Sequence, residues 1–176
     1  MKQNQTRKMI LSSFFIALGL ILPFITMQIP TIASQLCPMH IPVLLCGFVV
    51  GAPYGLIVGF ITPLLRSVLF GMPAMFPSAF CMAFELAAYG FFAGTFYRLL
   101  KKSTINVYVS LIGAMICGRI VWACASIFAY SIQSSAFTYQ MFIAGAFLNA
   151  IPGIILQLIL IPVVVLSLKK ARYIEA

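Results

Sequence analysis

The sequence predicts an all-α, polytopic membrane protein with six transmembrane helices and both termini in the cytoplasm. Of its 176 residues, 63% are hydrophobic and only 7% are charged, and the mean hydropathy is +1.12. Soluble domains carry about 25% charged residues, so this composition excludes an ordinary soluble fold. The apolar residues form long runs separated by joints that contain Pro, Gly, Ser and Thr. We therefore expect one integral membrane domain over residues 1–176.

Six apolar runs define the expected helices. They span about 9–27, 41–51, 55–70, 79–100, 104–130 and 141–168. The first run follows a basic segment, as in a signal peptide, but no small-residue cleavage site precedes Pro23 and no soluble domain would follow. The second and third runs are each shorter than the ~20 residues of a perpendicular span. The joint from Gly51 to Gly55 between them is either a cytoplasmic turn or a kink.

Positive charge distinguishes six spans from five. Lys and Arg gather in three clusters, near the N-terminus, at residues 98–102 and near the C-terminus. Six spans place all three clusters on one side, as the positive-inside rule prefers, whereas five spans would translocate the last two. The two short helices then require shielding by their neighbours or local thinning of the bilayer.

The outer connections of this topology are residues 28–40, 71–78 and 131–140. Apart from His40 they contain no acidic or basic residue, and they are instead rich in Pro, Met and aromatic residues. Such apolar loops are expected either to close over a site as lids or to rest on the membrane surface as interface anchors.

The sequence contains little material for catalysis or metal binding. It has two acidic residues, one histidine and five cysteines, and it lacks the HExxH, GxxxxGK[ST] and GxSxG motifs. The cysteines follow no CxxC or Cys/His pattern and are expected to pack as small apolar residues. We therefore predict no cofactor, no metal and no ATP hydrolysis by this chain. We also predict no nucleic acid partner, because the basic clusters alternate with apolar runs.

Three ionisable residues lie deep within the apolar runs: Arg66, Glu85 and Arg119. A charge at bilayer depth costs roughly 2.5 to 3.5 kcal/mol, so such residues are candidates for a functional site. The helix rise places Arg66 roughly 6 to 8 Å, Glu85 about 10 Å and Arg119 about 16 Å below the outer ends of their helices. Asn149 adds a polar group about 12 Å from the start of the sixth run, and His40 lies at the outer mouth of the second.

Two interpretations of these charges remain open. Glu85 could form an internal ion pair with Arg66 or Arg119 that only holds helices together. One carboxylate cannot neutralise two guanidinium groups, however, and the planar fork of Arg suits a carboxylate or phosphate. The surplus cation therefore predicts an outward-opening pocket for a small anionic or strongly polar molecule. For His40, a hydrogen bond to a loop carbonyl is the alternative to a ligand contact.

Small residues at four-residue spacing indicate close helix packing. Ser13 and Ala17 on the first helix would let another helix approach. The glycine series at 47, 51, 55 and 59 repeats this spacing, and we expect it to serve packing inside the subunit.

Three segments resemble the substrate-binding S component of energy-coupling factor (ECF) transporters. They are PMHIPVLL at 38–45, the glycine series followed by TPLLR at 62–66, and MAFELAAYG at 82–90. The resemblance implies a protein of the bacterial plasma membrane that captures a vitamin from outside, with the first, third and fifth loops closing over it. It also implies several partners. A transmembrane coupling protein would contact Ser13 and Ala17, two ATPase subunits would bind on the cytoplasmic side, and membrane lipid would surround the helices.

Among the substrates of this family, pantothenate best suits the surplus cation because it is a small monocarboxylate. Arg66 or Arg119 would hold the carboxylate, while Glu85, Asn149 and His40 would serve hydroxyl and amide groups. Riboflavin, cobalamin or another micronutrient is the alternative substrate. Two other classes of protein are weighed against transport: a membrane scaffold similar to the rod-shape proteins, and a membrane-embedded enzyme, which the scarcity of acids and bases disfavours.

Overall fold

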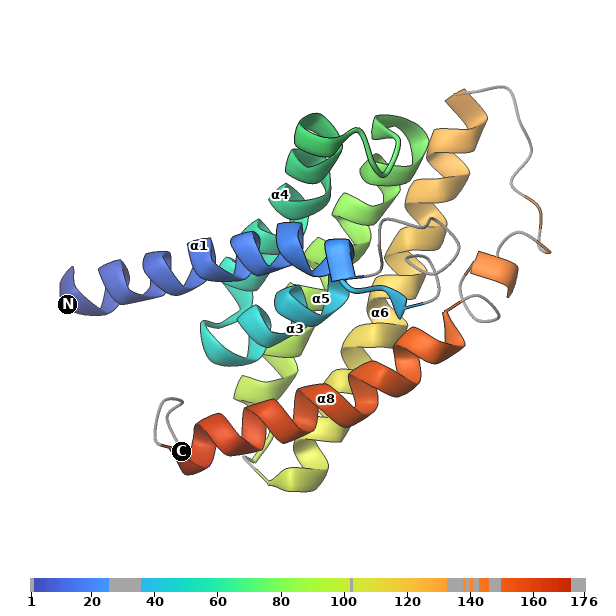
Figure 1. The fold of residues 1–176 in the computed structure, drawn as a ribbon. Coiled ribbons are helices and arrows are strands. Elements are labelled where there is room, and N and C mark those ends of the chain that lie inside the picture. Colours follow the sequence, from blue (N-terminus) through green and yellow to red (C-terminus); the bar gives the residue numbers. More distant parts are fainter. Residues whose placement is uncertain are drawn as a thin grey trace.

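The computed structural model describes residues 2–25, 36–101, 103–132, 138, 140, 143–145 and 150–171, and within these ranges the chain forms helices and no strands (Figure 1). Five helices are long and apolar enough to cross a membrane: α1 (Lys2–Ile25), α4 (Ala52–Phe70), α5 (Phe80–Leu99), α6 (Thr104–Ile132) and α8 (Ile151–Lys170). A sixth apolar helix, α3 (His40–Val49), is shorter. The predicted all-helical membrane architecture is confirmed, whereas the count of six crossings stays a prediction.

Two helices start more than three residues away from their predicted starts. α1 begins at Lys2 rather than near residue 9, because its polar N-terminal residues continue the helix beyond the apolar run. α8 begins at Ile151, about ten residues later than predicted, and its second residue is Pro152. Proline favours the first turn of a helix because its missing N–H would have no partner there. The short segment η1 (Met75–Ala79) precedes α5, and the extended backbone of Phe76 interrupts it.

The central helix of the bundle is α5, which packs against α3, α4 and α6 (Figure 1). α1 lies against α3 and α4, and α8 lies against α3 and α6. α3 has only ten residues, and the nine from His40 to Phe48 are all buried. A helix surrounded by protein need not match the thickness of the bilayer, which accounts for the short second run of the sequence.

The joint between α3 and α4 is a turn. Gly51 adopts a φ of 113°, in the left-handed region that favours glycine. α4 then folds back along α3, because a Cβ atom added to Gly55 would lie 2.9 Å from the Cα atom of Gly47. The alternative of a kink in one continuous helix is thereby excluded.

Glycines bring the backbones of α3, α4 and α5 into contact along a seam formed by Gly47, Gly55, Gly59, Gly90 and Gly94. A Cβ atom on Gly55 would lie 2.6 Å from the carbonyl oxygen of Gly90, and one on Gly94 would lie 2.7 Å from that of Gly47. Real Cβ atoms do not approach backbone this closely. The predicted packing role is confirmed for three members of the glycine series, while Gly51 forms the turn.

Replacement of Gly90 by Ala should destabilise the protein, because the added methyl group meets the backbone of Gly55. Overpacking of this kind costs typically about 1–3 kcal/mol. The same substitution at Gly113 is the control, since a Cβ atom there meets only the edge of the Phe96 ring. Thermal unfolding of both variants in detergent measures the difference. Equal melting temperatures for the two variants would contradict a rigid seam.

Candidate functional site

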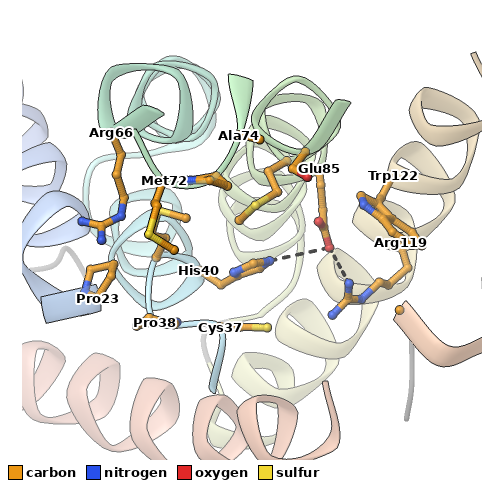
Figure 2. Close-up of a pocket in the computed structure, with 15 residues that line it drawn as sticks. Pro23, Cys37, Pro38, His40, Arg66, Met72, Ala74, Glu85, Arg119 and Trp122 are labelled. Carbon is orange, nitrogen blue, oxygen red and sulfur yellow. Dashed lines mark ion pairs between the residues drawn. The ribbon is translucent and has the colours of Figure 1, made fainter. Parts of the chain in front are cut away.

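A cavity of about 450 Å³ lies among the C-terminal parts of α1 and α4, the N-terminal parts of α3 and α5, and α6 (Figure 2). Its lining is Pro23, Cys37, Pro38, Met39, His40, Arg66, Met72, Pro73, Ala74, Ser78, Met82, Glu85, Arg119, Trp122 and Gly145. The volume falls within the range of about 300–1,000 Å³ found for small-molecule sites. Most of the lining residues are apolar, with a few polar groups among them.

Four of the five predicted pocket residues line this one cavity. His40 is the first residue of α3, Arg66 lies in the last two turns of α4, Glu85 lies in the second turn of α5, and Arg119 lies near the middle of α6. Residues from four helices therefore converge at one level of the bundle. Asn149, the fifth, lies outside the described residues.

The internal ion pair is present between Glu85 and Arg119. Nη1 of Arg119 lies 2.8 Å from Oε1 of Glu85, and Nε2 of His40 lies 3.6 Å from the same oxygen (Figure 2). Glu85 is 2% exposed, so its charge is compensated by Arg119 rather than by water. Among the described residues, neither ring nitrogen of His40 has a hydrogen-bond partner. Buried polar atoms are nearly always hydrogen-bonded, which makes this imidazole a group that a ligand could satisfy.

Arg66 lies apart from this pair. It is 3% exposed, and its Nη1 donates a hydrogen bond to the carbonyl oxygen of Leu20 over 2.7 Å. Its guanidinium carbon lies 5.2 Å from the ring centre of Phe24 and 5.4 Å from that of Phe70. In the described part of the chain no carboxylate pairs with it. Figure 2 shows Arg66 and Arg119 on opposite sides of the cavity with His40 between them, so the three charges form two separate poles.

Tyr89 packs next to the Glu85–Arg119 ion pair, between His40 and Gly118. It follows Glu85 by one helical turn, is 1% exposed, and its ring centre lies 5.3 Å from that of His40. On its other side the ring packs directly on Gly118, where a Cβ atom would collide with it. Because Gly118 precedes Arg119, Tyr89 sets the spacing between α5 and α6 at the level of the ion pair. Sequence analysis did not identify this role for either residue.

The apolar lining comes partly from two of the connections that the sequence predicts to lie outside. Cys37, Pro38 and Met39 precede α3, and Met72, Pro73 and Ala74 follow α4. Burial and the nearby Glu85 carboxylate raise the pKa of the Cys37 thiol to about 11. The thiol is therefore protonated at neutral pH and acts as a small, weakly polar surface.

Met82 was missed by sequence analysis, although a signal for it exists. It precedes Glu85 by three residues on α5, and residues at this spacing share one face of a helix.

Fold and cavity together define a class, a multi-pass helical membrane protein that can enclose a small molecule. Residues 7–165 match the family described as "ECF transporter, substrate-specific component", and the chain belongs to this family. Comparison with curated proteins and with solved structures gives no match. Membership makes the chain a substrate-binding transporter subunit of the cell membrane rather than an enzyme. It also implies a small-molecule substrate and a complex with membrane and ATPase components.

Replacing Arg119 by Met should destabilise the protein strongly, because it leaves the Glu85 carboxylate buried without a counterion. Removing one partner of a buried pair costs about 3–5 kcal/mol. The double variant Glu85→Gln/Arg119→Met should recover much of this loss, since no buried charge is then left alone. Heat denaturation of both variants measures the effect, with Arg98→Met at the exposed end of α5 as control. Additive losses in the double variant would argue against a coupled pair.

Proposed function

We propose that this subunit captures a small anionic vitamin at the cavity, with pantothenate as the first candidate. The observation that supports the proposal is Arg66, which no carboxylate of the described residues neutralises. The Glu85–Arg119 pair is neutral as a unit, so with a neutral His40 the cavity carries one net positive charge. An anion of one unit charge complements it, and guanidinium groups bind carboxylates through two parallel hydrogen bonds.

The two poles suggest the orientation of the ligand. The carboxylate would lie at Arg66, and hydroxyl and amide groups would lie against His40, Glu85 and Arg119. The apolar centre of pantothenate would contact the methionine side chains between the poles. Asn149 remains a proposed contact at the same site.

Trp122 provides the reason to keep a second candidate. Its indole ring lines the cavity beside Arg119 (Figure 2), and a flat neutral vitamin such as riboflavin could stack on it. Cobalamin fits less well, because a corrinoid is much larger than a cavity of about 450 Å³. The Glu85–Arg119 pair supports the alternative of a membrane scaffold. That alternative explains neither the cavity nor the membership of the transporter family.

For the topology we propose six crossings with both termini in the cytoplasm. The cavity lies at one end of the bundle, whereas Lys8, Arg98 and Lys170 belong to helix ends at the other. The positive-inside rule assigns that basic end to the cytoplasm and the cavity to the outside. The segments at 37–39 and 72–74, which line the cavity, would then serve as the lids.

We propose that the coupling protein docks on the exposed face of α1, which points away from the rest of the bundle. Ser13 and Ala17 are exposed, and the hydroxyl group of Ser13 donates to the Met9 carbonyl of its own helix over 3.1 Å. Phe14 and Ile21 are exposed beside them. The face therefore presents small side chains within an apolar surface, which allows a close helix contact.

A panel of vitamins tested by thermal shift on the purified protein should reveal the substrate. A ligand at 100 times its dissociation constant adds ~2.7 kcal/mol of stability. Arg66→Gln should weaken pantothenate binding roughly 10- to 100-fold, the loss expected for a hydrogen bond to a charged group. Arg98→Gln, remote from the cavity, is the matched control. If riboflavin alone stabilises the protein, or Arg66→Gln binds pantothenate normally, the anionic assignment is wrong.

Enlarging the small residues of α1 should separate assembly from binding. The variant Ser13→Leu/Ala17→Leu is expected to lose co-purification with the coupling protein, because the larger side chains hold the helices apart. Vitamin binding should persist, since neither residue lines the cavity. Cys124→Leu, an exposed position on α6, is the control. Normal assembly of the double variant would place the docking site elsewhere.

A further inference from the structure

A second recess, of about 860 Å³, lies at the end of the bundle opposite to the cavity with Arg66 and Glu85, the proposed vitamin cavity. It is formed by the first turns of α1, the turn between α3 and α4, and the last turns of α5. Its lining is Arg7, Lys8, Leu11, Gly47, Phe48, Val49, Val50, Gly51, Ala52, Pro53, Tyr54, Gly94, Thr95, Tyr97, Arg98 and Leu99. Three of these side chains are cationic and none is acidic. The one carboxylate side chain among the described residues, that of Glu85, lies at the other cavity.

Other groups in the recess also suit an anion. The first turn of α4, from Ala52 to Tyr54, lines the recess, so the positive end of the helix dipole lies there. Tyr97 is only 5% exposed and lines the recess, and its hydroxyl group has no hydrogen-bond partner in the described part of the chain. The ammonium group of Lys8 lies 6.0 Å from the ring centre of Tyr54, which keeps it at the rim of the recess.

The surroundings of the recess indicate what kind of anion it takes. Met9, Ile10 and Leu99 are exposed apolar side chains next to Lys8 and Arg98 in the sequence. A ligand with an anionic head and apolar tails can satisfy both surfaces, and basic pockets between transmembrane helices on the cytoplasmic side commonly bind phospholipid head groups. We infer that this recess binds the phosphate group of an anionic phospholipid, with its acyl chains along the apolar rim.

The test compares two double variants that remove the same charge. Lys8→Gln/Arg98→Gln acts inside the recess, whereas Lys101→Gln/Lys170→Gln removes two exposed charges that do not line it. The full-length protein in neutral detergent is titrated with phosphatidylglycerol and with phosphatidylcholine, and bound lipid is counted by native mass spectrometry. We expect a preference for phosphatidylglycerol that the first variant loses, with roughly 30-fold weaker binding for two charges, and that the second variant keeps.

Three results would overturn the inference. If both double variants lose phosphatidylglycerol binding equally, the effect is one of general surface charge. If the unmodified protein binds phosphatidylglycerol and phosphatidylcholine equally, the recess is not a head-group site. Competition by glycerol phosphate as strong as by the lipid would identify a soluble anion instead. If the double variant does not fold, Arg98→Lys should keep lipid binding and Arg98→Gln should weaken it. Because these residues do not line the vitamin cavity, vitamin binding reports separately on the proposed function.

Discussion

The buried Glu85 carboxylate is the constraint on which the cavity end of the bundle depends. A charge in the interior of a membrane bundle requires a counterion, and Arg119 supplies it from the neighbouring helix. The same oxygen draws His40 close from α3, so that three helices meet around one charge. Tyr89 fills the space beneath, between His40 and the small surface of Gly118. The polar end of the cavity is thus a consequence of neutralising one carboxylate.

The glycine seam determines where the cavity can form. Along α5, backbone contacts at Gly94, Gly90 and Leu86 hold α3 and α4 tightly against it. The cavity begins at the next residue toward the N-terminus of α5, Glu85, and continues to Met82. The same helices, α3, α4 and α5, are therefore closely packed at the glycine seam and separated by open space at the cavity. This arrangement leaves α3 covered by protein, which is why a ten-residue helix suffices.

Much of the fold was predictable, because hydropathy and charge report directly on membrane insertion. The three charges within the apolar runs were found by their energetic cost alone, whereas their pairing depends on helix rotations that the sequence does not contain. Arg66 bonds to the main-chain carbonyl of Leu20, and every residue has a carbonyl, so no side-chain pattern could indicate this contact. The late start of α8 was hidden within a continuous apolar run, although Pro152 offered a signal for it.

The division of the charges into two poles has a consequence for selectivity under the proposed function. The carbonyl and the two rings around Arg66 stabilise its guanidinium group without neutralising it, so an anion at that pole is still favoured. No described residue hydrogen-bonds to the ring nitrogens of His40, whose Nε2 lies 3.6 Å from Oε1 of Glu85, so a hydroxyl or amide group at this other pole would satisfy them. A molecule that reaches only one pole leaves buried polar groups unpaired at the other, and sites built in this way reject such analogues strongly. Selectivity would therefore depend on the length of the ligand as much as on its charge.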